Sequence, residues 1–196
     1  MTGHHRRLLF KKWSRALHIY LSMLGLVMIL FFAATGFILN HDDWFGLATS
    51  QTTQSEGQVP VALLAAPDKL GLVEKLRADF RVAGALDSFD VQEDQLSLAF
   101  KSPARRVEVS VDRKTGHVAL TRESHGAVAR LADLHKGTDA GPAWRLVIDL
   151  TALMLVISCV TGIVLWLLVP KWRPLGLAAV LVCTVVCAAI YFFLVP

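Results

Sequence analysis

The sequence has few cysteines, and none lies in its polar middle part. Only three occur in 196 residues, and each falls inside a long apolar segment: Cys159, Cys183 and Cys187. This placement excludes a disulfide framework for the polar part. Cys183 and Cys187 are four residues apart, a spacing open to a metal pair or to small packing residues on one helix face. We favour packing.

Signals for three further classes are also missing. No glycine-rich phosphate-binding fingerprint occurs, so we expect no nucleotide cofactor. The net charge of +4 comes from short basic segments beside apolar ones rather than from a basic groove, so we expect no nucleic-acid partner. The first apolar segment is far longer than the 7–15 residues of a signal-peptide core, and no small-x-small cleavage site follows it. We therefore expect it to be a retained membrane anchor.

Apolar residues are abundant. They make up 54% of the chain, against about 45–50% in soluble domains, and they gather in three blocks of the length that a membrane-spanning helix needs. Basic residues before the first block, and Lys171 and Arg173 between the second and third, predict a cytoplasmic location for both short segments. The lipid bilayer is therefore the first expected partner. The predicted organisation is a basic cytoplasmic N-terminus (1–15), transmembrane helix 1 (16–41), an extracytoplasmic domain with a linker (42–123), an interfacial helix (124–137), transmembrane helix 2 (143–169), a cytoplasmic loop (170–174) and transmembrane helix 3 (175–195), with the C-terminus outside.

The middle of the chain predicts a small α+β module. Residues 61–80 carry leucine and valine at helical spacings, and FDVQ, QLSLAF, RRVEVSV and HVALTRE alternate apolar with polar residues. We predict one helix packed on a three- to four-stranded antiparallel sheet, with the turn-rich residues 47–59 as a linker. The fold class is thus an α-helical membrane protein with three transmembrane helices and this small extracytoplasmic module between helices 1 and 2.

His18 lies inside the predicted first span, where an ionisable side chain indicates function, and His41 lies at the outer end of that span. His18 and His41 are about 34 Å apart if the first span is one helix. An amphipathic segment carries His135 to the outer interface. Two neutral imidazoles on neighbouring helices suit a six-coordinate b-type haem, and we predict His41 and His135 as such a pair. His18 lacks a histidine partner, so its haem would need a second subunit, a non-histidine ligand or an open position.

Small residues accompany the inner histidine. Gly25 and Gly36 fall on the same side of the predicted helix as His18. Such a strip permits close helix packing, which we favour slightly, or a slot for a flat cofactor. Zinc or iron held directly by residues 41–43 and His135 is the competing chemistry, because Asp42 and Asp43 add carboxylates to the imidazoles.

A short repeat occurs in the first two spans. The dipeptide Thr35-Gly36 recurs as Thr161-Gly162, in the contexts ATGFILN and VTGIVLW. We expect small-residue notches at both positions, with threonine hydroxyls bonded back to their own helix.

Three segments in this order resemble the PepSY-associated transmembrane (PepSY-TM) family: RALHIYLSMLGLVMILFFAATGFILNH, VSVDRKTGHVAL and LHKGTDAGPAWRLVIDLTALMLVISCVTGIVLW. The resemblance implies a bacterial cytoplasmic (inner) membrane protein, related to haem-containing ferric and ferric-siderophore reductases that carry electrons through b-type haems. Carried onto this chain, the ligands of one or two haems b are His18, His41 and His135. The chain has fewer spans and intramembrane histidines than the larger siderophore reductases, which favours a homodimer.

The resulting hypothesis is transmembrane electron transfer. A cytoplasmic-side donor such as a quinol or flavin carrier supplies single electrons, and Fe(III) or a ferric chelate is reduced on the periplasmic side for iron uptake. Asp42, Asp43 and Glu123 are candidates for holding the ferric substrate. The alternative is a non-enzymatic, membrane-anchored PepSY module that binds, inhibits or assists assembly of another protein. A haem or metal carrier without turnover is a third possibility.

Overall fold

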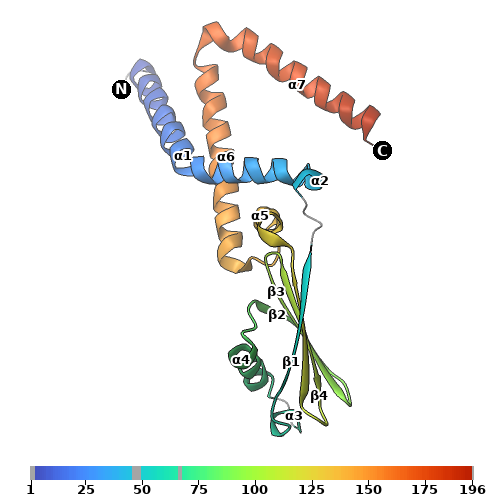
Figure 1. Cartoon of the computed structure of the whole chain (residues 1–196). Coiled ribbons are helices and arrows are strands. Elements are labelled where there is room, and N and C mark those ends of the chain that lie inside the picture. The colour runs from blue at the N-terminus through green and yellow to red at the C-terminus, as the bar shows by residue number, and fades with distance from the viewer. Residues whose placement is uncertain (1–2, 46–49, 66–67, 196) are drawn as a thin grey trace. The chain divides into compact units, whose positions relative to one another are not determined.

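The computed structural model describes residues 3–45, 50–65 and 68–195, and these form two compact units (Figure 1). One unit comprises residues 1–29 with 149–196, and the other comprises residues 30–148. The helices α1 and α6 contribute to both. The helical elements are α1 (Gly3–Leu39), α2 (Asp42–Phe45), α3 (Ala62–Ala65), α4 (Lys69–Phe80), α5 (Gly126–Lys136), α6 (Gly141–Leu167), the 3₁₀ turn η1 (Pro170–Trp172) and α7 (Arg173–Leu194).

Three helices are long and apolar enough to cross a membrane: His5–Leu39, Gly141–Leu167 and Pro170–Leu194. By this criterion the chain is a multi-pass membrane protein. The basic segment expected to precede the first span is itself helical from Gly3 onward. Its lysine, arginine and leucine residues favour a helix, and no proline interrupts them. The loop predicted at 170–174 is instead a 3₁₀ turn, η1, followed directly by α7, which begins at Arg173.

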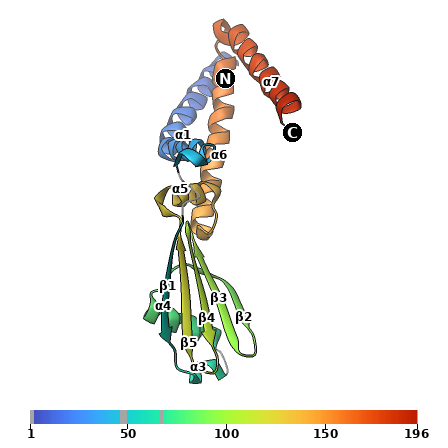
Figure 2. The ribbon, with the colours of Figure 1, turned by 45° about the vertical axis from the view of Figure 1, so that its right-hand side comes forward.

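The second unit contains a five-stranded antiparallel sheet with the strand order β1-β5-β4-β3-β2, which Figure 2 shows side by side. The prediction of three or four strands was therefore too low. In chain order the strands follow α1 and precede α6, but the compact unit also takes in the end of α1 and the start of α6. The strands are β1 (Gln51–Gln58), β2 (Ala85–Val91), β3 (Gln95–Ser102), β4 (Arg105–Asp112) and β5 (His117–Ser124).

The predicted linker at 47–59 is wrong over the part that the structure describes, where it forms strand β1. β1 pairs with β5 from Gln51↔Ser124 to Gln58↔His117. It lies at the edge of the sheet, and most of its residues are exposed. An edge strand is held by main-chain pairing and needs no apolar alternation, so its sequence resembles a polar connection. Residues 46–49 lie outside the described part.

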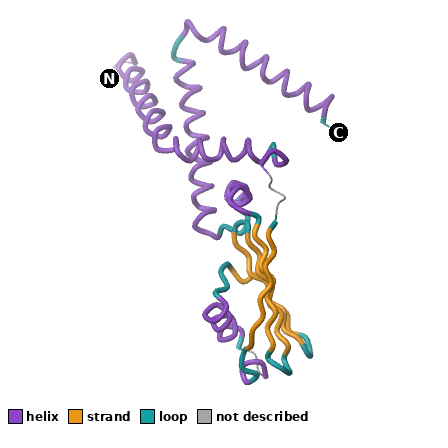
Figure 3. The backbone as a smooth tube through the Cα atoms, viewed as in Figure 1, coloured by secondary structure: helices purple, strands orange, loops and turns teal. Residues whose placement is uncertain are grey.

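One face of the sheet carries the core and is covered by α4, while none of the described helices covers the opposite face (Figure 3). Alternate residues of β3, β4 and β5 point into this core, as the period-2 pattern predicted. From α4, Leu72, Val73 and Leu76 are buried against them. Phe100 and Leu76 have no exposed surface. The module is thus held by a single apolar layer between helix and sheet.

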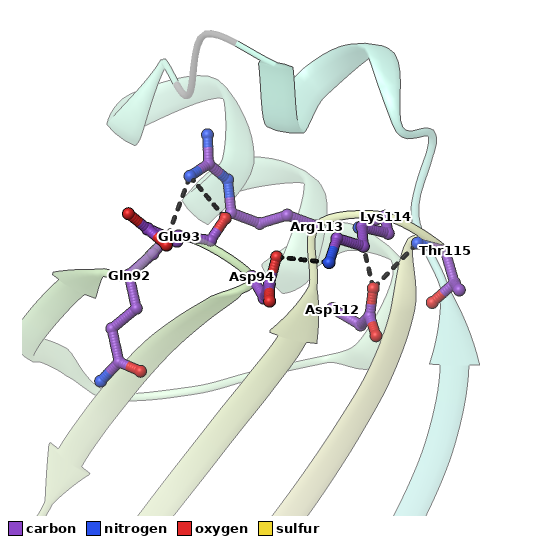
Figure 4. Close-up of polar contacts among 7 residues, drawn as sticks. All are labelled: Gln92, Glu93, Asp94, Asp112, Arg113, Lys114 and Thr115. Atoms are coloured by element: carbon purple, nitrogen blue, oxygen red, sulfur yellow. Dashed lines mark hydrogen bonds and ion pairs between the residues drawn. The ribbon is translucent and has the colours of Figure 1, made fainter.

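The turn between β4 and β5 is built by Asp112 (Figure 4). Its Oδ1 accepts hydrogen bonds from the main-chain N–H groups of Lys114 (2.8 Å) and Thr115 (2.9 Å). Lys114 reaches Asp94 of the neighbouring turn, with Nζ and Oδ1 2.7 Å apart. The main-chain hydrogen bonds from Thr115 and Lys114 to the charged carboxylate lower the pKa of Asp112 below its ordinary value. The two turns are therefore held together at this end of the sheet.

We expect Asp112→Asn to change how the stability of the sheet depends on pH. A lowered folded-state pKa adds stability that is present above the unfolded value of about 4 and is lost as pH falls through the folded value. The wild type should have the higher urea midpoint at pH 7, and the difference should shrink at pH 3. Pulse proteolysis of the full-length protein in neutral detergent measures it. Asp90→Asn on strand β2 is the matched control, and an equal effect there would contradict the prediction.

Candidate functional site

His18 on α1 contacts the Thr161-Gly162 pair of α6. Its Nδ1 lies 2.9 Å from the Ser158 carbonyl oxygen and 3.0 Å from Thr161 Oγ1. Thr161 Oγ1 donates to the Ile157 carbonyl at 2.8 Å, in the back-bonding that the sequence predicted. Ser158 and Thr161 are buried. The imidazole is therefore fixed by buried oxygens of the neighbouring helix. We call this set of contacts the His18 notch.

His135 on α5 makes the corresponding contacts with the Thr35-Gly36 pair of α1. Its Nδ1 lies 2.7 Å from Thr35 Oγ1, and this hydroxyl donates at 2.7 Å to the Phe31 carbonyl. Thr35 is only 3% exposed. The ring of Phe32 meets the imidazole edge-on, with centroids 5.4 Å apart. We call this set the His135 notch.

The two glycines allow the imidazoles to approach the helix backbone closely. A Cβ atom added at Gly162 would lie 3.3 Å from His18 Cε1, and one added at Gly36 would lie 3.2 Å from His135 Cε1. Both distances are shorter than ordinary van der Waals contacts. The glycines of the expected small-residue strip on α1 are thus in contact with side chains. Gly36 contacts His135, and Gly25 contacts Met154, whose Cε atom would lie 3.0 Å from a Cβ added at Gly25.

The hydrogen-bond partners fix which nitrogen of each ring carries the proton. A carbonyl oxygen only accepts, so the contact with Ser158 makes His18 Nδ1 the donor. The Thr35 hydroxyl already donates its hydrogen to Phe31, so it accepts from His135 Nδ1. In a neutral imidazole the other nitrogen then has a free lone pair. In the neutral form of both rings, Nε2 is thus the nitrogen that can accept a hydrogen bond or bind a metal.

His41 has different neighbours from His135. Its Nδ1 donates at 3.0 Å to the carbonyl of Phe37, one turn earlier. Its ring stacks on Phe37 and lies against Trp44, with centroid distances of 4.3 and 4.2 Å. These contacts thus do not bring together the predicted pair of His41 and His135. Like the other two rings, His41 has its Nδ1 tied to an oxygen.

The predicted carboxylate site receives no support from the described side chains. Among them, no three histidine, cysteine, aspartate or glutamate residues gather where they could hold a metal ion. The side chain of Asp42 lies outside the described part, and Asp43 is exposed. Glu123 lines a separate pocket on the sheet. Ser158 and Met154 were missed, because no local pattern in the sequence links them to His18 or Gly25.

Fold and contacts together define a class: a multi-pass membrane protein with a five-stranded antiparallel module, in which two imidazoles are each seated on a threonine-glycine pair. The chain belongs to the family described as putative PepSY_TM-like, whose model matches residues 12–196. The match includes both notches and the whole sheet. Comparison with curated proteins and with solved structures found no match.

Proposed function

We propose that this protein carries electrons across a bacterial cytoplasmic membrane through haem b and reduces Fe(III) or ferric chelates on the periplasmic side. When bound, haem supplies a one-electron carrier. His18 and His135 would hold the haem iron, and His41 is a third candidate. A quinol or flavin carrier on the cytoplasmic side is the proposed donor.

The observation that carries the proposal is the fixed Nδ1–H of both seated imidazoles. Haem iron binds the unprotonated nitrogen of a neutral imidazole. Histidines that bind metals usually donate their other N–H to an oxygen, which fixes the ring and raises its basicity. His18 does so toward the Ser158 carbonyl, and His135 does so toward Thr35 Oγ1. The donor set therefore fits haem iron.

The contacts also favour a homodimer as the working form. Each notch supplies one seated imidazole, whereas a six-coordinate haem with two histidine ligands needs a pair. A second copy of the chain is the simplest source of an equivalent ring. This replaces the His41–His135 pairing expected within one chain.

Charge supports the proposed orientation. Arg6, Arg7 and Lys11 precede the apolar part of α1, and Lys171 and Arg173 lie at the junction of α6 and α7. The positive-inside rule assigns both regions to the cytoplasm. The five-stranded module and the C-terminus then face the periplasm, where a ferric substrate would arrive.

The visible spectrum tests the proposal. Full-length protein from haem-replete expression, purified in mild detergent, should show paired sharp α and β bands in the reduced-minus-oxidised spectrum. His18→Ala and His135→Ala should each lose the band intensity of its own haem. His125→Ala is the control, because His125 starts α5 without a side-chain capping bond. Ferric citrate added to the reduced protein should then discharge the α band.

A second variant tests whether His135 acts as a haem ligand or only as a packing residue. Thr35→Val keeps the shape of the side chain but removes the oxygen that accepts from His135 Nδ1. Loss of such a supporting hydrogen bond costs roughly 10–100-fold in metal affinity. The affinity for haem should fall by about that factor while the protein stays folded. Wild-type spectra in all these variants would contradict the ligand assignment.

One observation favours the alternative, a module that binds or inhibits another protein. None of the described helices covers the sheet face opposite α4 (Figure 3). A depression on it is lined by small, polar and charged side chains, Ser88, Ser97 and Thr121 among them. Absence of haem bands after haem-replete expression would leave this function as the better account.

A further inference from the structure

A pocket at one end of the sheet collects arginines from three separate segments. It has a volume of about 250 Å³ and lies where β1 starts, β4 starts and β5 ends. Arg105 comes from β4, Arg122 from β5, and Arg81 from the residue after α4. Glu123 is the one acidic residue in its lining. Gln51, Thr53 and Ser124 add neutral polar groups.

Strand register explains why these side chains meet. Arg122 pairs with Thr53 on β1 and with Val107 on β4, while Ser124 pairs with Arg105. Residues directly opposite one another in an antiparallel pair point to the same face, with Cβ atoms about 4.5–5.5 Å apart. The chain thus places two guanidinium groups on one sheet face, two residues apart along the ladder. This placement follows from the register of the β4–β5 hairpin.

The arginines of the pocket have no carboxylate partner among the described side chains. Other basic residues of the module do have one, as in Lys101 with Asp87 and Arg106 with Glu108. Arg122 instead donates to Ser55 Oγ and to the Phe80 carbonyl, both at 2.6 Å. These neutral acceptors orient the guanidinium without cancelling its charge. The pocket therefore keeps an excess of positive charge.

Arg81 is held in a backbone conformation that arginine rarely adopts. It caps α4 with φ of +52°, in the left-handed region where glycine is the usual residue. Such a conformation is unfavourable for a side chain with a Cβ atom. Residues held in this way cluster at ligand sites. A glycine would cap the helix more easily but would bring no charge to the pocket.

We propose that this pocket binds a small anion with two or more closely spaced carboxylate groups. Planar guanidinium groups pair with carboxylates through two parallel hydrogen bonds, and three of them around one pocket match a polycarboxylate better than a single charge. The proposal rests on the pocket alone. If the proposed function also holds, the ligand class is that of anionic ferric polycarboxylate complexes, and the module is where they bind.

Titration calorimetry of the full-length protein in neutral detergent tests this, with citrate and its redox-inert gallium(III) complex as probes. Wild-type protein should bind, and more weakly at high salt. Arg105→Gln and Arg81→Gln should each weaken binding by about 10-fold or more, the usual loss for a charge-assisted hydrogen bond. Arg122 is left unchanged because it also holds Ser55 and Phe80.

Arg106→Gln is the matched control. Arg106 neighbours Arg105 on β4, points to the other face and pairs with Glu108. Because breaking an exposed ion pair has little effect, anion binding by this variant should stay within about twofold of wild type. Nanodiscs with and without anionic lipid identify the source of the anion. If anionic lipid competes with citrate, and this competition is lost in Arg105→Gln, the site binds a lipid phosphate and the proposed carboxylate ligand is wrong. Absence of citrate binding, or equal loss in Arg106→Gln, would overturn the site. Because gallium is not reduced, neither result bears on the haem proposal.

Discussion

On the proposed function, Gly36→Leu should abolish haem binding at the His135 notch as completely as removing the histidine. A Cβ atom added at this position would lie only 3.2 Å from His135 Cε1, and leucine adds three further carbons beyond the Cβ atom. The imidazole must then leave Thr35, which takes away the acceptor that fixes its tautomer. We expect haem content per chain to fall by the whole share of that site, measured by the pyridine haemochrome assay.

Ala34→Leu is the control for added bulk. Ala34 is exposed on α1 two residues before Gly36, so leucine there enlarges the helix without reaching the notch. It should keep wild-type haem content. Gly162→Leu, with the exposed Ala152→Leu as its control on α6, repeats the test at the His18 notch. Full haem content in both glycine variants would mean that the notches do not position haem ligands.

Gly116→Ala should destabilise the five-stranded module severely. Gly116 has φ of +72°, and an added Cβ atom would lie 2.3 Å from the carbonyl oxygen of Val59. The Val59 N–H donates to the Gly116 carbonyl at 2.9 Å, so the two segments cannot separate without losing this bond. Left-handed backbone alone costs about 1–3 kcal/mol with a side chain, and the clash adds to it. Pulse proteolysis in urea, on full-length protein in neutral detergent, measures the loss.

Gly126→Ala separates the two contributions. Gly126 has a similar φ of +82°, but nothing lies within 4 Å of an added Cβ atom. This variant should show only the backbone cost and therefore a smaller fall in the urea midpoint than Gly116→Ala. A fall as large as that of Gly116→Ala would mean that the approach of Val59 contributes nothing.

Local patterns predicted the parts of the fold that depend on neighbouring residues. Alternation in QLSLAF and RRVEVSV identified β3 and β4, because each strand has one buried face. Long apolar runs identified the three candidate membrane helices. β1 has neither signal: it is polar, and its pairing partner β5 lies far along the chain. Its existence depends on a contact that no local pattern encodes.

The candidate site was predicted in its residue types but not in its contacts. The sequence singled out His18 and the Thr-Gly repeat separately, yet nothing local connects His18 with Ser158 or Thr161. His41 and His135 seemed paired because both were assigned to one interface. The structure instead ties His41 to the preceding turn of its own chain segment. Which histidine meets which pair depends on helix packing, which composition and periodicity leave open.

The strand order also sets the sequence in which the module can assemble. β2 to β5 are joined as successive hairpins, so each strand can pair as soon as the next one is made. β1 comes before all of them but pairs only with β5, the last strand synthesised. It must therefore wait, unpaired, until the rest of the sheet exists. A polar sequence such as QTTQSEGQ stays hydrated during that delay, whereas an apolar strand would be prone to aggregate.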